Sequence, residues 1–110
     1  MIEHAHGLTN AALEAIAGLE RQVVAADGGR LKLEWGTLRT RPTDDVRDLL
    51  WWDDGRLLGF LGIYGSGRRQ FELAGMVHPD ARRRGIGRAL LEAAVPLAGG
   101  GGRERLLLIV

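Results

Sequence analysis

The chain opens with apolar positions spaced at helical intervals. They recur every three or four residues, so that their side chains share one face of an α-helix, at Leu13, Ile16, Leu19 and Val23. Thr9 is a suitable N-cap, because its hydroxyl oxygen can accept a hydrogen bond from an amide of the first turn. Asp27-Gly28-Gly29 supplies the C-terminal turn. The sequence therefore predicts a helix over Asn10–Ala26, and residues 31–43 predict a short irregular helix or turn.

From Asp48 onward the pattern changes to that of β-strands. Leu49–Trp52 and Leu57–Tyr64 are apolar runs separated by an Asp-Gly pair, which favours a tight hairpin because both turn positions prefer a positive φ. Glycines at 65 and 67 turn the chain again before a third run, Gln70–Val77. These runs predict an antiparallel meander of three strands.

A second helix is predicted after Gly85. Its apolar stripe consists of Ile86, Ala89, Leu90, Ala93 and Leu97. We expect Pro96 to bend or end this helix, and Gly99–Gly102 to stop it. Leu106–Val110 is an unbroken apolar run, typical of a buried strand with a parallel neighbour. The predicted fold is α/β, with an N-terminal helix, a three-strand meander and one βαβ unit on a mixed sheet. Residues 1–110 are expected to form one domain.

Composition narrows the possible functions. The chain has 110 residues, a net charge of +1 and no cysteine, so a disulfide or a thiolate metal site is excluded. The balanced charge argues against a nucleic-acid-binding protein. His4 and His6 are too few ligands to close a metal site, so an ordinary N-terminal strand is favoured and no metal is expected. The absence of a signal peptide or a long apolar run predicts a cytoplasmic protein without a membrane partner.

The stretch Leu73–Leu91 carries the chemistry. A strand ends there, and a Gly-x-Gly turn opens a helix whose first amides are free to bind an anion. Four arginines within seven positions add positive charge. The glycines allow a phosphate to approach the backbone, which favours a pyrophosphate ligand over a merely solvated basic face. A Rossmann dinucleotide site would need a third glycine and an acidic residue after the next strand, and this chain has neither.

The string Val-His-Pro-Asp-Ala-Arg-Arg-Arg-Gly-Ile-Gly, residues 77–87, resembles the acetyl-CoA motif of the GNAT acyltransferase superfamily. The resemblance covers Asp48–Val110 closely and Ile2–Ala26 loosely. It implies that acetyl-CoA binds where the strand ends and the helix begins, and that no metal takes part. The implied pantetheine contacts are backbone groups of Gly75, Met76 and Val77. The implied pyrophosphate contacts are Arg83, Arg84, Gly85, Ile86, Gly87 and Arg88, with Arg82 supporting the loop and the phosphate charge.

The resemblance also implies an activity, the transfer of an acetyl group to an amine of a small molecule or peptide. The backbone N–H of Met76 or Val77 would hold the oxyanion, and Glu72 is the candidate base, although an outward-facing strand carboxylate explains it equally well. The family's usual acid is a tyrosine on a helix after the second parallel strand, and Tyr64 does not lie at that position. Two alternatives remain, a non-catalytic acyl-CoA-binding or regulatory module and an N-terminal fragment of a longer acetyltransferase.

The apolar strand Leu106–Val110 predicts an association. The resemblance implies that the fold continues past this strand, so we expect its outer edge to need a neighbour from elsewhere. An exposed apolar edge pairs readily with another chain. We therefore expect a homodimer, or a partner chain, to cover Leu106–Val110.

Overall fold

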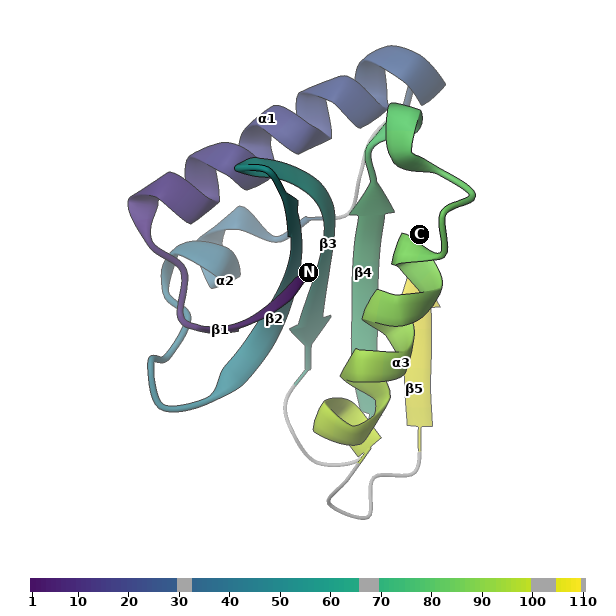
Figure 1. Ribbon diagram of the computed structural model, residues 1–110. Helices are drawn as coiled ribbons and strands as arrows, with labels where there is room; N and C mark the ends of the chain where they lie inside the picture. Colours follow the sequence, from purple (N-terminus) through teal and green to yellow (C-terminus); the bar gives the residue numbers. More distant parts are fainter. Residues whose placement is uncertain (30–32, 66–69, 100–104, 110) are drawn as a thin grey trace.

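The computed structural model describes residues 1–29, 33–65, 70–99 and 105–109 (Figure 1). Its elements are β1 (Ile2–His6), α1 (Asn10–Asp27), α2 (Trp35–Arg39), β2 (Val46–Asp53), β3 (Arg56–Tyr64), β4 (Gln70–Val77), a 3-10 turn (Pro79–Ala81), α3 (Ile86–Gly99) and β5 (Arg105–Ile109). The strands form one sheet in chain order; β1 to β4 are antiparallel to their neighbours and β5 is parallel to β4. The predicted α/β fold is confirmed, and β1 adds a fourth antiparallel strand beside the meander.

The local patterns predict most elements to within a few residues. The Thr9 hydroxyl accepts a hydrogen bond from the Ala12 amide at 3.1 Å, as an N-cap does, and α1 ends one residue beyond the prediction. The third meander strand has its predicted bounds. The predicted C-terminal strand corresponds to β5; Val110 and the glycines at 100–102 lie outside the described residues.

Of the two effects expected of Pro96, a bend or an end of the helix, the structure excludes the end. α3 continues to Gly99, three residues further. A proline removes one backbone donor and crowds the carbonyl four residues earlier, which belongs here to Glu92. Both residues are exposed, so water can satisfy that carbonyl and the last turn persists.

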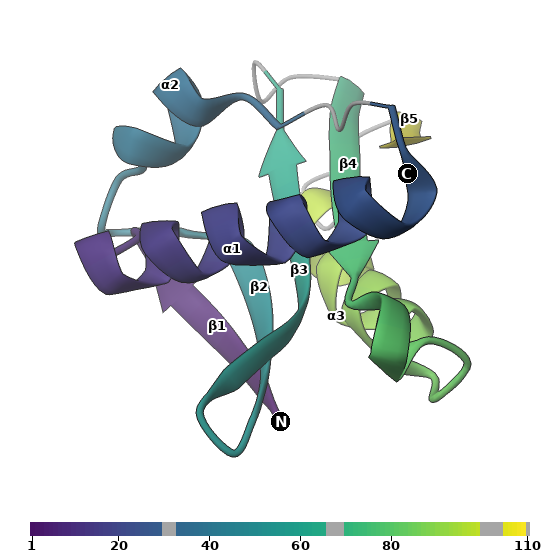
Figure 2. The same cartoon turned by 90° about the horizontal axis from the view of Figure 1, so that it is seen from above.

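The core has two layers, one on each face of the sheet. α1 covers one face and α3 the other, as Figure 2 shows from above. Side chains alternate along β3, so that Phe60 packs beneath α1 while Leu61 packs beneath α3. A Cβ on Gly59 would lie 2.8 Å from a methyl of Ile86, so this glycine lets the first turn of α3 pack directly on β3.

A buried ion pair joins the segment after α2 to the sheet. The Arg41 guanidinium donates to both carboxylate oxygens of Asp48, at 2.9 and 3.1 Å, and both side chains are at least 97% buried. The same guanidinium lies over the ring of Tyr64, 4.9 Å from its centroid. Burial raises the pKa of Asp48, and Arg41 opposes that rise. The pair therefore fixes residues 40–48 against the face covered by α1.

The described helices do not include one with the length and hydrophobicity needed to cross a bilayer.

Candidate cofactor-binding site

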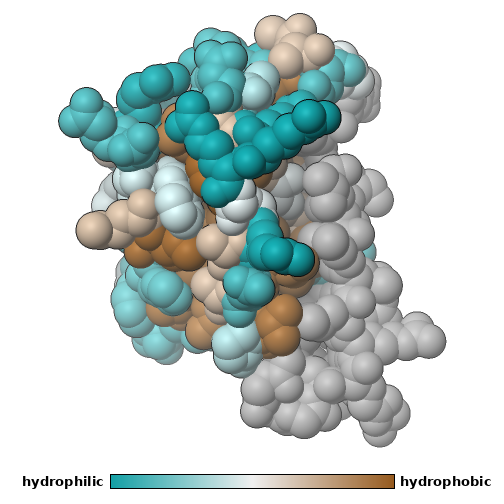
Figure 3. All heavy atoms as spheres, turned by 45° about the vertical axis from the view of Figure 1, so that its right-hand side comes forward, coloured by the Kyte–Doolittle hydropathy of each residue, from teal (hydrophilic) through white to brown (hydrophobic). Residues whose placement is uncertain are grey.

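A cleft of about 630 Å³ lies where the C-terminal end of α1, the C-terminal end of β4 and the start of α3 meet. Its walls are mainly apolar, with Val23, Phe60 and Leu90 among the lining residues, and its charged lining residues are Asp27, Arg82 and Arg88. Figure 3 shows hydrophilic side chains gathered over the upper part of the molecule, with apolar surface below them. The cleft can hold a long apolar ligand with an anionic end.

The end of β4 offers free backbone groups to this cleft. β4 pairs with β5 over Gln70–Ala74, whereas it pairs with β3 as far as Val77. Within the described part of the chain, Gly75–Val77 therefore have a strand neighbour on one side only, and all three line the cleft. A ligand that carries amide groups can pair with this edge as a further strand would.

Strand alternation shows which of these groups point away from β3. The His78 N–H donates to the Leu58 carbonyl on β3 at 2.7 Å. Because alternate residues of a strand point their N–H and C=O groups to opposite sides, Met76 also points to β3, and Gly75 and Val77 point away from it. The Val77 carbonyl accepts a hydrogen bond from Arg82 at 3.3 Å, as this direction requires. Val77, rather than Met76, thus presents its N–H to the cleft.

The start of α3 forms the second part of the site. The Gly85 carbonyl accepts from the Ala89 N–H at 2.9 Å, so Gly85 is the N-cap, and the amides of Ile86, Gly87 and Arg88 form the open first turn. Over the described residues these three amides have no hydrogen-bond acceptor. A Cβ on Gly87 would meet only a Val77 methyl, at 3.6 Å, so the cleft side of this turn is open to an anion.

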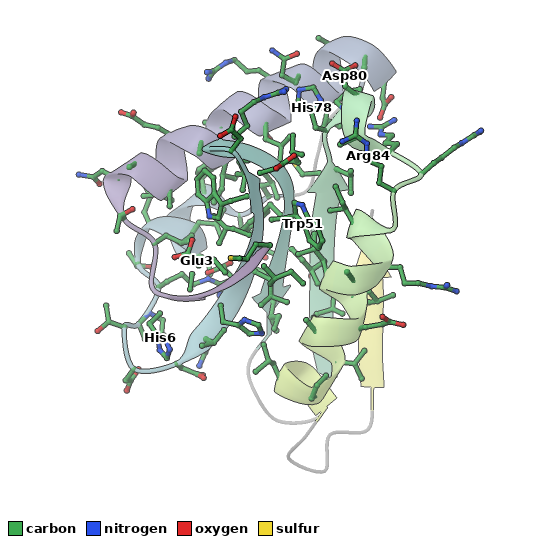
Figure 4. All side chains as sticks on the ribbon, viewed as in Figure 1. Glu3, His6, Trp51, His78, Asp80 and Arg84 are labelled. Carbon is green, nitrogen blue, oxygen red and sulfur yellow. The ribbon has the colours of Figure 1, made fainter. Side chains whose placement is uncertain are left out.

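The loop before α3 holds a left-handed backbone at two positions. Arg83 has φ +65° and Gly85 has φ +81°. For an arginine this conformation is uncommon, and such residues cluster at functional sites. The loop is braced by Arg84, which donates to the Asp80 carbonyl at 3.3 Å, and by the His78 ring, which accepts from the Asp80 N–H at 3.0 Å. Figure 4 shows these three side chains together above the start of α3.

Arg82, which was expected to support the loop and the phosphate charge, bridges the cleft mouth. Its two terminal nitrogens donate to the Asp27 carboxylate at 2.9 and 2.6 Å, and its Nε–H donates to the Val77 carbonyl. These hydrogen bonds from Arg82 lower the pKa of Asp27. Asp27 was expected only to end α1. Only one feature of the sequence points to this role: Asp27 is an acidic residue at the C-terminal end of a helix. The helix dipole disfavours a negative charge there, so a cationic partner is expected.

Glu72, the candidate base, lies outside the cleft wall. It is half-buried on β4 opposite Tyr64 and shares the α1 face with Ala74 and Met76. It lies four positions before Met76, a distance of about 13 Å along a strand. The structure therefore brings together Gly75–Val77, Arg82, Gly87 and Arg88, but not Glu72.

Tyr64 and the N-terminal histidines were also considered at the sequence level. The Tyr64 hydroxyl is buried and finds no hydrogen-bond partner in the described residues, and burial raises its pKa to about 12. His4 and His6 lie on β1. The part of the chain that the structure describes contains no group of three or more side chains able to hold a metal ion.

Comparison with a family model matches residues 12–110 to the acetyltransferase (GNAT) family. Two curated proteins with significant similarity are named mycothiol acetyltransferase. The Mycolicibacterium vanbaalenii protein is 39% identical over 77 residues, which cover 69% of this chain and 24% of that protein. The Geodermatophilus obscurus protein is 40% identical over 98 residues, which cover 84% of this chain and 31% of that protein. The chain thus spans only a quarter to a third of the length of these relatives.

Solved structures share the fold. N-acetylglutamate synthase from Neisseria gonorrhoeae, solved with coenzyme A and N-acetyl-glutamate, superposes with a TM-score of 0.70 at 23% identity. The match covers 98% of this chain and 24% of that protein.

Proposed function

Because this chain belongs to the GNAT acetyltransferase family, we propose that it binds acetyl-CoA in the cleft and transfers the acetyl group to an amine. One observation carries the proposal. The free edge of β4 and the open first turn of α3 face the same cleft, so amide groups and phosphates of one ligand can bind together.

The chain's backbone supplies most of the proposed contacts. Gly75 pairs with the pantetheine amides, and the amides of Ile86, Gly87 and Arg88 bind the pyrophosphate. Arg83 and Arg84 add the positive charge of the loop. In the proposed transfer the amine nitrogen bonds to the thioester carbon and gives up one proton, the carbon–sulfur bond breaks, and the thiolate leaves with the electron pair and takes up a proton from water. The Val77 N–H stabilises the oxyanion that exists after the nitrogen has bonded and before the carbon–sulfur bond breaks.

The acceptor is proposed to be a small-molecule amine. The curated relatives are mycothiol acetyltransferases by name, which favours a small molecule over a peptide. The cytoplasm is the proposed location, from composition alone.

A second function, binding of an acyl-CoA without turnover, is favoured by a different observation. Among the described lining residues the only carboxylate is Asp27, and Arg82 holds it. No free general base therefore lines the cleft, and a catalytic proton must leave through water or through Glu72.

Two measurements on the wild-type chain test these functions. Calorimetric titration with CoA measures binding, and thiol release from acetyl-CoA with a panel of small amines measures turnover. We expect binding at micromolar CoA and amine-dependent thiol release. Binding without turnover with any amine would support the second function, and absence of binding would contradict both.

The Glu72→Gln variant tests the base. If Glu72 removes the amine proton through water, kcat should fall by roughly 10²- to 10⁴-fold, because that is the usual contribution of general base catalysis. The Kd of CoA should not change, since Glu72 lies outside the cleft wall. The exposed Glu92→Gln on α3 is the matched control. A wild-type kcat in Glu72→Gln would make Glu72 an ordinary strand carboxylate.

We also propose that β5 pairs with a second copy of this chain or with a partner chain. β5 is the outer strand of the sheet, and its outer edge has no partner strand among the described residues. The side chains of β5 lie outside the described set, so the proposal rests on the backbone edge and the apolar sequence. Sedimentation velocity at low micromolar concentration should give a dimer mass, and a stable monomer would contradict this proposal.

A further inference from the structure

The guanidinium of Arg82 connects the three segments that form the cleft mouth. It bonds to the last residue of α1, to the last carbonyl of β4, and it belongs to the loop before α3. A guanidinium has five N–H donors in one plane. Three of them are used here, one on each nitrogen, so two remain and their directions are fixed by the other three. Arg82 is therefore a preoriented donor beside the cleft.

Folding stability gives only a small reason for Asp27, the partner that fixes this plane. A carboxylate at the C-terminal end of a helix opposes the helix dipole. The two side chains are 40% and 46% exposed, and ion pairs of that exposure contribute little to folding. Asp27 also places a negative charge in the lining of a cleft proposed to bind a polyanion.

We propose that Asp27 is a positioning residue for the cofactor: it orients Arg82 so that the two remaining N–H donors face the phosphates. This inference rests on the proposed function, since it presumes CoA in the cleft. This inference and a simple count of charges predict opposite changes in CoA affinity when Asp27 is removed. Charge alone predicts that removing Asp27 tightens binding of a polyanion, whereas positioning predicts that removing it weakens binding.

The Asp27→Asn variant separates the two. We expect its Kd for CoA to rise by about 5- to 20-fold, because an amide cannot replace the two charge-assisted hydrogen bonds that hold the guanidinium plane. The Kd for pantetheine, which lacks the pyrophosphate, should not change. A general distortion of the cleft would weaken both ligands equally, and that result would overturn the proposal.

Asp80→Asn is the matched control. It likewise removes one negative charge near the start of α3, from a side chain that is 86% exposed and that, among the described residues, forms no ion pair with Arg82. We expect CoA to bind this variant as tightly as the wild type, or slightly more tightly. Equal weakening in Asp27→Asn and Asp80→Asn would overturn the proposal, because both would then act through something other than Arg82.

A double-mutant cycle completes the test. If Asp27 acts through Arg82, then Asp27→Asn should have no further effect on CoA binding in an Arg82→Gln background. Asp27→Glu, which keeps the carboxylate, should recover part of the lost affinity. Unchanged or tighter binding in Asp27→Asn alone overturns the inference while leaving the proposed function intact. Absence of CoA binding by the wild type would instead contradict the proposed function.

Discussion

The Gly87→Val variant is expected to lose measurable CoA binding while keeping its fold. The valine side chain would stand on the cleft side of the first turn of α3, where a phosphate must approach the amides of Ile86–Arg88. Hydrogen bonds to a charged group contribute roughly 1.5–3 kcal/mol each. Loss of two of them would weaken binding by at least about 100-fold.

The fold should tolerate this change. A Cβ at Gly87 meets only a Val77 methyl, at the ordinary contact distance of 3.6 Å. Glycine is also the poorer helix former, so helix propensity does not fall. From the sequence, Gly85 and Gly87 are expected to have the same role, but in the structure their backbone conformations differ. Gly85 has φ +81°, so a side chain there would strain the N-cap itself. Loss of binding in a Gly85 variant could therefore come from this strain and would not test phosphate binding by the amides of Ile86–Arg88.

Calorimetry with CoA and a thermal melt of each variant decide this prediction. Gly18→Val is the matched control, because a Cβ at this helical glycine of α1 also meets a single side-chain atom at 3.6 Å, Nη2 of Arg21, and Gly18 does not line the cleft. Both variants should melt near the wild-type temperature, and only Gly87→Val should fail to bind. Wild-type affinity in Gly87→Val would contradict the proposal that the amides of Ile86–Arg88 bind the pyrophosphate.

What the sequence predicts here is local. The hydroxyl of Thr9, the Asp-Gly hairpin and the Gly-x-Gly turn act over a few residues, and each indicates its element correctly. The same local pattern places the free amides of α3, because a helix start leaves them open whatever else the chain does. Gly75–Val77 could be placed in the site only through the family resemblance, since the point where β4 and β5 cease to pair depends on tertiary structure.

The remaining features depend on contacts that local patterns do not encode. Asp27 and Arg82 are 55 positions apart, and nothing near either one specifies the other. The choice between Met76 and Val77 depends on how β4 is aligned with β3, which the His78–Leu58 hydrogen bond fixes. Whether Glu72 lines the cleft depends on where the cleft lies along β4, so its residue type alone could not decide between a base and a surface carboxylate.

The Arg41→Met variant is expected to be the most destabilising single change in the described core. It leaves the Asp48 carboxylate, which is fully buried, without the one side chain that hydrogen-bonds to it among the described residues. Removing one member of a buried ion pair typically costs about 3–5 kcal/mol, out of roughly 5–15 kcal/mol for a whole domain. Arg39→Met is the control, since Arg39 lies exposed nearby over the ring of Trp35 and should cost less than about 1 kcal/mol.

The pH dependence makes this last prediction specific to Asp48. Burial already raises the pKa of Asp48 in the wild type, and Arg41 opposes the rise, so the variant must raise this pKa further. A carboxyl whose pKa is higher in the folded than in the unfolded state favours folding when protonated and opposes it when ionised. The loss of unfolding free energy in Arg41→Met should therefore be largest at pH 7 and shrink as the pH falls towards 5.

Urea unfolding at both pH values measures this loss. Combining Arg41→Met with Asp48→Leu should recover much of the lost stability at pH 7, because no buried charge then remains. A deficit that is the same at both pH values and persists in the double variant would mean that Arg41 stabilises the fold through its packing on Tyr64 alone.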